Sequence, residues 1–229
     1  MVVAANRDEV LDRPATGPRV WEGGFVAPRD EQAGGTWLGL THRGLFIGVT
    51  NRFLAPRQNE RESRGQLVVE ALRHDSAVAL HRSMAALSPF RFNAFHLLYA
   101  DAQNAFVTWS DGERLTQSTL EPGVHIVTER SLGGDDRSRT AFITSHWPAT
   151  LTPESLEHLL SLTRPDDPLG GVCVEAPAFN YGTRSSAVLF VGQPLTTTRF
   201  LFADGRPDQT PFADVSRLVR SIMSSPERA

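Results

Sequence analysis

The chain has 229 residues and a formal charge of −3, and all 23 of its basic side chains are arginine. The absence of lysine excludes Schiff-base enzymes, a pyridoxal-phosphate anchor and the lysine-dependent phosphate sites of P-loop proteins and kinases. A single cysteine, Cys173, excludes an internal disulfide, a four-thiolate zinc site and an iron–sulfur cluster. The near-neutral charge argues against a nucleic-acid partner. No signal peptide and no apolar run of about 20 residues is found, so we expect a soluble, cytoplasmic protein without a transmembrane segment.

The N-terminal part of the chain alternates short apolar runs with polar and turn residues. Residues 2–5 predict a short buried strand that ends at the polar group Asn6-Arg7-Asp8-Glu9. Residues 13–29 contain three prolines and a glycine pair, which predict a loop. Residues 36–41 and 45–50 then predict the two strands of a β-hairpin.

Helix and strand patterns follow in turn. Ser63, with Gln66 three residues later, matches a helix capping box, and Asp75 is the expected cap of a second helix that ends near Leu87. Four strands are then predicted, over residues 95–100, 105–110, 114–119 and 123–127. The polar segments between the first three of these strands are typical of tight turns.

The last third of the chain repeats this mixture. Thr152-Pro153-Glu154 is typical of a helix start, and that helix is expected to run to about Leu162. Further strands are predicted around Cys173 and over residues 184–191 and 196–203, and a last helix over residues 212–223. Strands outnumber helices, and the helices lie between groups of strands. We therefore predict an α+β fold of layered antiparallel sheets in one domain, residues 1–229, because no linker divides it.

The group Asn6-Arg7-Asp8-Glu9 is the first candidate site. An amide, a guanidinium and two carboxylates in a row at a strand end can face one pocket. The alternative is an exposed loop with a local ion pair.

Two further polar or aromatic groups lie near the predicted hairpin. Trp37, within the glycine-rich residues 34–39, offers a stacking surface, or it is a core tryptophan at a strand start. Asn51 and Arg52 place an amide and a guanidinium at the end of the next strand, where a simple turn is the alternative.

The third candidate is the segment from Tyr181 to Ser186. Alternation along the strand places Arg184 and Ser186 on one face and Ser185 on the other. An arginine at the base of an apolar strand needs a carboxylate, a ligand anion or water. The alternative to a ligand is an ion pair with Asp8 or Glu9.

Known catalytic and metal-binding signatures are absent from the sequence. No G-x-S-x-G, H-E-x-x-H or G-x-G-x-x-G motif occurs, and the seven histidines show no metal-ligand spacing. His96 and His125 are expected to be half-buried strand residues with satisfied hydrogen bonds. Cys173 is expected to be a buried, unreactive thiol.

Several motifs in a fixed order together carry a resemblance. They are residues 2–9, 13–14, 34–39, 50–52, 63–65, 122–125 and 181–186. In this order they resemble the NRDE-motif family, whose animal members are called transport and Golgi organisation protein 2. The resemblance extends over nearly the whole chain.

The resemblance implies a four-layer α-β-β-α sandwich similar to N-terminal-nucleophile hydrolases, with choloylglycine hydrolase and penicillin acylase as the nearest analogues. In such enzymes a cysteine at residue two attacks an amide carbonyl, and its own amino group is the base. By this resemblance Arg7 and Asp8 would orient the cysteine, Asn51 would donate to the oxyanion, and Arg184 would line the same pocket. Family members are linked to haem trafficking and to acyl-coenzyme A or lipid handling.

The sequence departs from the family pattern in two places. Family members usually begin Met-Cys and carry one more strand before the NRDE strand, whereas here Val2 follows Met1 inside that strand. We expect in-frame Met-Cys codons about twenty residues upstream, the length of one strand and a turn. The later Ser-Asn of the family is replaced by Thr128 and Glu129, which removes an amide donor.

Two functions follow from these observations. The first is binding or trafficking of a small amphipathic ligand, haem or an acyl-coenzyme A, in a pocket lined by the NRDE and YGTR segments. Its predicted contacts are Arg7, Trp37, Asn51, Arg52, Tyr181 and Arg184, with no metal site and no catalytic residue in the chain as written. The alternative is an amide or thioester hydrolase whose cysteine lies upstream, with Asn6, Arg7, Asp8, Glu9, Asn51 and Arg184 around it. A third, weaker hypothesis is a purely structural, partner-binding domain.

Overall fold

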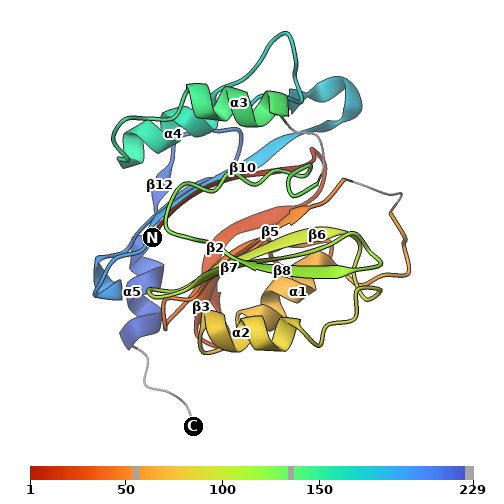
Figure 1. Ribbon diagram of the computed structural model, residues 1–229. Helices are drawn as coiled ribbons and strands as arrows, with labels where there is room; N and C mark the ends of the chain where they lie inside the picture. The colour runs from red at the N-terminus through yellow and green to blue at the C-terminus, as the bar shows by residue number, and fades with distance from the viewer. Residues whose placement is uncertain (54–56, 134–136, 225–229) are drawn as a thin grey trace. The chain divides into compact units, whose positions relative to one another are not determined.

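The computed structural model describes residues 1–53, 57–133 and 137–224. The chain divides into two compact units. The terminal unit combines Met1–Pro18 with Arg137–Ala229, and the central unit comprises Arg19–Asp136. Each unit has its own antiparallel sheet and its own helices (Figure 1).

The sheet of the terminal unit is assembled from both ends of the sequence. Its strand order is β1 (Val2–Val10), β10 (Tyr181–Phe190), β11 (Arg199–Ala203) and β12 (Ala213–Asp214), and the short β9 (Glu175–Ala176) pairs with the start of β10. β1 and β10 run antiparallel along their whole lengths, from Val2 opposite Phe190 to Val10 opposite Tyr181. This pairing joins positions that lie almost at opposite ends of the chain.

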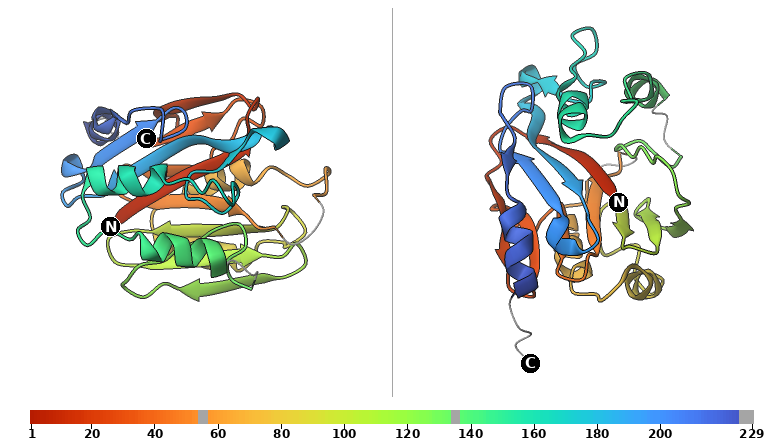
Figure 2. Two further views of the ribbon diagram at one scale, coloured as in Figure 1. Left: turned by 90° about the horizontal axis from the view of Figure 1, so that it is seen from above. Right: turned by 90° about the vertical axis from the view of Figure 1, so that its left-hand side faces the viewer.

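Three helices belong to the terminal unit. They are α3 (Arg137–Ser145), α4 (Pro153–Ser161) and α5 (Ser216–Ser224). α4 packs against β1 and β10 through a buried leucine stripe, and α5, the dark blue helix of Figure 2, packs against β11. Short 3₁₀ turns lie at Pro177–Phe179 and Leu195–Thr197.

The central unit is a seven-stranded meander in which each strand pairs with its neighbour in sequence. Its strands are β2 (Ala15–Trp21), β3 (Phe25–Asp30), β4 (Leu38–Thr41), β5 (Phe46–Asn51), β6 (Phe95–Ala100), β7 (Ala105–Ser110) and β8 (Leu115–Thr119), and β2 begins in the terminal unit, before Arg19. Helices α1 (Arg64–Ala71) and α2 (Ala77–Met84) cover one face of this sheet (Figure 1). The buried side chains between helices and sheet include Leu67, Leu80, Phe92, Leu97 and Tyr99.

Much of the sequence-based prediction is confirmed. The α+β class with antiparallel sheets is correct, the β4–β5 hairpin forms, and β6 and β7 have the predicted bounds. α4 begins as expected: the Thr152 hydroxyl accepts a hydrogen bond from the Ser155 N–H (3.1 Å), and the Ser155 hydroxyl accepts one from the Thr152 N–H (2.9 Å). A reciprocal cap of this kind satisfies helix-end groups that otherwise lack partners.

The prediction of a loop over residues 13–29 is wrong, because β2 and β3 occupy most of it. β2 is the last strand of its sheet, and an edge strand tolerates Pro18 because one side of its backbone needs no partner. Pro28 lies beyond the part of β3 that pairs with β4, which ends at Val26 opposite Leu40. Proline is therefore compatible with strands here, on an edge strand at Pro18 and beyond the β3–β4 pairing at Pro28.

Other boundaries also need correction. Residues 123–127 form no strand, and His125 there is exposed. The cap of α2 is Ser76, whose side chain accepts from the Ala79 N–H, whereas Asp75 forms an ion pair with Arg43. Ser63 does cap α1, but it accepts from Gly65 and not from Gln66.

The end of the chain departs from the prediction as well. Leu195–Thr197 is a 3₁₀ turn, so β11 begins only at Arg199, and β12 precedes a last helix that begins at Ser216. α3 was not predicted. Among the described residues no helix is long and apolar enough to cross a bilayer.

Candidate functional site

The first and third candidate segments of the sequence, residues 6–9 and 181–186, lie side by side in the terminal unit. β1 carries Asn6 to Glu9, and β10 carries Tyr181 to Arg184. Asp8 is opposite Thr183, Glu9 is opposite Gly182, and the ladder continues to Tyr181. Residues 6–9 therefore lie inside a strand, and the prediction that a strand ends before Asn6 is wrong.

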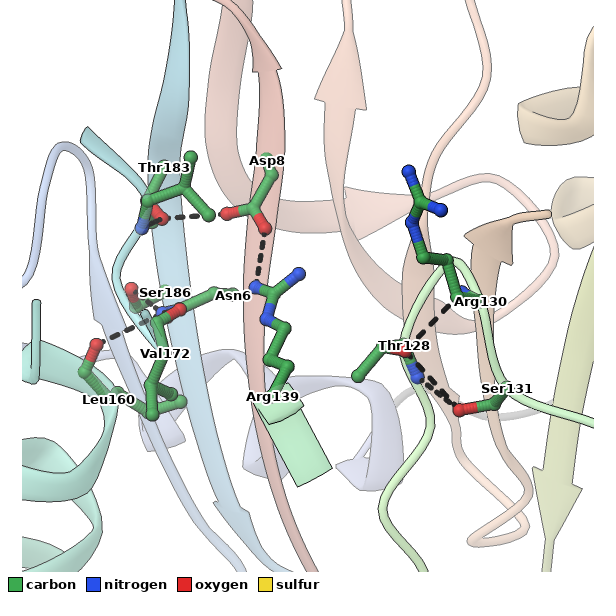
Figure 3. Close-up of polar contacts among 11 residues, drawn as sticks. Asn6, Asp8, Thr128, Arg130, Ser131, Arg139, Leu160, Val172, Thr183 and Ser186 are labelled. Carbon is green, nitrogen blue, oxygen red and sulfur yellow. Dashed lines mark hydrogen bonds and ion pairs between the residues drawn. The ribbon is translucent and has the colours of Figure 1, made fainter. Parts of the chain in front are cut away.

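Asn6 ties three parts of the terminal unit together (Figure 3). Its Nδ2 donates to the carbonyls of Leu160 (3.0 Å) and Val172 (2.8 Å), and its Oδ1 accepts from the Ser186 hydroxyl (2.5 Å). All of these contacts are internal, so Asn6 fixes the end of α4 and the segment at Val172 to the sheet.

Asp8 accepts hydrogen bonds from two sides (Figure 3). Its Oδ1 accepts from the Thr183 hydroxyl (2.6 Å), and its Oδ2 accepts from Nη2 of Arg139 (2.9 Å). Thr183 in turn accepts from the Val174 N–H (2.9 Å). Arg139, on the unpredicted helix α3, is therefore a site residue that sequence reasoning missed.

Glu9 and Arg7 are also held inside the unit. Glu9 lies 3.9 Å from Arg7 and 3.7 Å from Arg13. Arg7 is 8% exposed, which excludes the interpretation of residues 6–9 as an exposed loop.

A β-bulge interrupts the ladder next to these residues. Arg7 is opposite Ser185 and Asp8 is opposite Thr183, so Arg184 is an extra residue without an opposite partner. The Nε of Arg184 and the hydroxyl of Ser185 are both buried, and neither has a hydrogen-bond partner among the described residues. The expected ion pair of Arg184 with Asp8 or Glu9 is not formed, because other arginines and Thr183 occupy those carboxylates.

The predicted residues of the central unit gather at the end of β5. Thr50 lies opposite His96 on β6, and its hydroxyl is 2.9 Å from His96 Nδ1. His96 Nε2 is 2.9 Å from the Ser131 carbonyl oxygen. The Asn51 side chain is exposed, and Arg52 Nη2 donates to the Leu132 carbonyl (2.7 Å).

His96 has hydrogen bonds at both ring nitrogens, as predicted, but it is fully and not half buried. Burial, together with the nearby Arg52 charge, lowers the pKa of His96 to about 4, although the Ser131 carbonyl acts in the opposite direction. The ring is therefore neutral at neutral pH.

The loop that approaches His96 contains the departure from the family pattern. The Thr128 N–H donates to the Ser131 hydroxyl (2.9 Å), and the Arg130 N–H donates to the Thr128 hydroxyl (3.3 Å) (Figure 3). Thr128 thus shapes a turn of this loop.

Trp37 precedes β4 and is half-buried, and its carbonyl accepts from the Val49 N–H (2.8 Å). The glycine at position 35 has a structural reason, because a side chain there would meet the backbone of Gly65 at the start of α1. This close approach accounts for part of the glycine-rich pattern around Trp37.

Cys173 is buried, as predicted, but it lies in an irregular segment before β9 and not in a strand. Its thiol is 3.6 Å from Asp208 Oδ1. Burial, aided by the Asp208 charge, raises the pKa of Cys173 to about 11, which leaves it protonated and unreactive at neutral pH. No metal-binding group of histidine, cysteine or acidic side chains occurs within the part of the chain that the structure covers.

The six predicted ligand contacts therefore fall into two groups. The terminal unit holds Arg7, Tyr181 and Arg184 on its paired strands, and the central unit holds Trp37, Asn51 and Arg52.

The fold resembles that of N-terminal-nucleophile hydrolases. The chain is similar to a mutant of conjugated bile acid hydrolase from Clostridium perfringens, with a TM-score of 0.50, 9% sequence identity and coverage of 94% of this chain and 89% of the other. A second variant of that hydrolase gives the same TM-score at 8% identity, with coverage of 94% and 84%. At such low identity the similarity establishes the fold alone.

The family model for "Transport and Golgi organisation 2" matches residues 1–200, and the chain belongs to this family. Transport and Golgi organization protein 2 homologs of Bos taurus and Homo sapiens are 33% and 30% identical over 107 and 111 residues. The mouse homolog is 32% identical over 107 residues. These matches cover 44–46% of this chain and only 38–40% of the relatives.

Proposed function

We propose that this chain binds a small amphipathic ligand through an acidic group, and that Arg184 and Ser185 on β10 hold that group. The ligand class is an apolar body that carries carboxylates or phosphates. Haem and acyl-coenzyme A both have this chemistry, and the two are separated by the experiment below.

The observation that carries the proposal is the pair of unsatisfied donors at the bulge. The Arg184 Nε and the Ser185 hydroxyl are buried without partners among the described residues, and Ser185 is only 4% exposed. A buried polar group without a hydrogen bond costs roughly 1–3 kcal/mol. An anionic oxygen would satisfy either donor, and a guanidinium matches a carboxylate or phosphate in shape and charge.

Two further features support this position. Bulges are common next to binding sites, because the extra residue redirects a side chain. Arg7 lies opposite Ser185 in the ladder and Tyr181 begins the same strand, so two other predicted contacts are on the same pair of strands. Contacts of the ligand with Trp37, Asn51 and Arg52 stay predictions, because these residues belong to the central unit.

The test is a titration of the purified protein with haemin and, separately, with palmitoyl-coenzyme A. We expect saturable binding of at least one of them, by a Soret shift or by calorimetry. Arg184→Ala should weaken this binding about 10- to 100-fold, the value of a lost charge-assisted hydrogen bond. Ser185→Ala should weaken it by a smaller factor of about five.

Arg217→Ala is the matched control, because Arg217 is an exposed arginine on α5 of the same unit. This variant should bind the ligand with the affinity of the wild type. Absence of saturable binding of both ligands would reject the proposal, as would an Arg184→Ala variant that binds like the control.

The hydrolase alternative makes a different prediction for the same titration. A binding protein returns the ligand intact, whereas a hydrolase releases free fatty acid and coenzyme A with time, which chromatography of the mixture detects. The alternative also depends on the expected upstream Met-Cys, which the coding DNA before Met1 tests.

A further inference from the structure

Three hydrogen-bonded polar groups at the end of β5, those of Thr50, His96 and Ser131, play no part in the function proposed above. Thr50, half-buried, contacts Nδ1 of His96, and Nε2 of the fully buried His96 contacts the Ser131 carbonyl, both at 2.9 Å. All three residues belong to the central unit.

The direction of each hydrogen bond follows from chemistry. A carbonyl oxygen only accepts, so His96 Nε2 carries the proton in its contact with Ser131. A neutral imidazole has one N–H, which leaves Nδ1 as an acceptor, and Thr50 must donate to it. The only proton of the Thr50 hydroxyl is therefore committed to His96, and its Oγ1 can only accept from a further partner.

The loop around Ser131 holds this arrangement in place. The Phe53 N–H donates to the Glu129 carbonyl (2.8 Å), and Leu132, next to Ser131, has a left-handed φ of 55°. A non-glycine residue in this region costs about 1 kcal/mol or more and persists only where its surroundings impose it. The Ser131 carbonyl is thus fixed on the imidazole by its loop.

Arg52 places a donor beside this acceptor. Its N–H continues the ladder to the Ala94 carbonyl (3.1 Å), so Arg52 lies two positions along the same extended segment and on the same face as Thr50. Nη2 of Arg52 donates to Leu132, but its Nε is buried and has no partner among the residues that the structure describes.

A nucleophilic role for Thr50 does not fit these facts. Because burial lowers the pKa of His96 to about 4, its imidazole is a weak base at neutral pH, and its other nitrogen faces a neutral carbonyl and no carboxylate. The arrangement orients a hydroxyl and does not activate it.

We propose that Thr50 and Arg52 form a second binding site, specific for a ligand group that has a neutral N–H or O–H donor close to an oxygen acceptor. A secondary amide and a 2-hydroxy acid both have this chemistry. Thr50 Oγ1 accepts from the donor and Arg52 donates to the oxygen, and Thr50 determines the specificity for the donor.

The test uses two pairs of probes that differ only in the donor. N-acetylglycine is compared with N-acetylsarcosine, which lacks the N–H, and lactate with 2-methoxypropionate, which lacks the O–H. Affinities are measured by NMR from the shift of the ¹³C-labelled Thr50 methyl group. We expect the donor-bearing member of at least one pair to bind about fivefold more tightly, the value of one neutral hydrogen bond. The probe pair that shows this difference in affinity identifies the ligand group as a secondary amide or a 2-hydroxy acid.

Variants separate recognition from folding. The preference for the donor-bearing probe should disappear in Thr50→Val, where binding is measured from the NMR signals of Arg52. It should persist in Thr50→Ser, which keeps the hydroxyl. Thr119→Val, at an exposed threonine on β8, is the matched control and should keep the preference. Equal affinities within both pairs in the wild type, or a preference that survives in Thr50→Val, would overturn the proposal. So would ¹⁵N spectra of His96 that place the proton on Nδ1.

Discussion

The terminal and central units each bury a polar cluster, but they stabilise it differently. In the terminal unit, Asp8 is matched by the charge of Arg139 and by the Thr183 hydroxyl. In the central unit, His96 is kept neutral between a hydroxyl and a carbonyl. Removal of one partner from a buried charge pair leaves an uncompensated charge, whereas a neutral hydrogen-bonded cluster is destabilised most when its imidazole is protonated. The two units should therefore respond to different perturbations.

The largest effect is expected for the charge pair. The side chains of Asp8 and Arg139 are only 16% and 11% exposed, so Asp8→Ala breaks a largely buried ion pair. We expect a loss of about 3 kcal/mol in the free energy of unfolding, measured by urea denaturation. Glu175→Ala, which breaks the more exposed pair with Arg206 in the same unit, is the control and should lower the free energy of unfolding much less. Equal losses in the two variants would remove the contrast between the clusters.

An effect of similar or smaller size is expected from pH in the central unit. The pKa of His96 is about 4 in the folded protein against 6.5 for a free histidine, so the unfolded chain binds more protons between these values. The contribution of His96 is complete above pH 6.5 and is lost as the pH falls towards 4, by up to roughly 3 kcal/mol. Unfolding measured across this range should show the slope in the wild type. The slope should be reduced in His96→Gln, and an unchanged slope would show that His96 is not its source.

The smallest effect is expected at the N-terminal cap of α4, the helix that packs against β1 and β10. The hydrogen bonds of this cap are between uncharged groups. Thr152→Ala removes the acceptor for the Ser155 N–H and should cost about 1 kcal/mol. Thr150→Ala, an exposed residue two positions earlier, should change stability by much less. If the Thr152 variant lost as much stability as Asp8→Ala, the helix cap and not the charge pair would dominate the terminal unit.

Local sequence patterns predicted the strands from β4 to β8 of the central meander, but not β2 and β3. β6 and β7 have the predicted bounds because their apolar runs end at the turn residues Asp101 and Asp111, whose carboxylates accept backbone N–H groups in the turns. The α+β class and the start of α4 follow from equally local rules. The expectation of one domain over residues 1–229 stays a prediction.

The candidate site was harder to predict because its contacts are long-range. Asp8 meets Arg139 across 131 positions, and α3 shows little pattern because only Ile143 in it is buried. The bulge at Arg184 depends on the register of β1 and β10, which no local motif specifies. The sequence identified Asn6, Asp8 and Arg184 as candidates, but the pairing of strands decides which of them are satisfied.

The pairing of β1 with β10 also has a consequence for the order of folding. Each strand of the central meander needs only its neighbours, so its sheet can form while synthesis continues. β1 is made before all of them, yet its only partner among the described strands begins at Tyr181. The nascent chain must therefore carry β1 without this partner until the whole central unit has been translated. During that interval the unpaired backbone groups of β1 are open to chaperones and to aggregation.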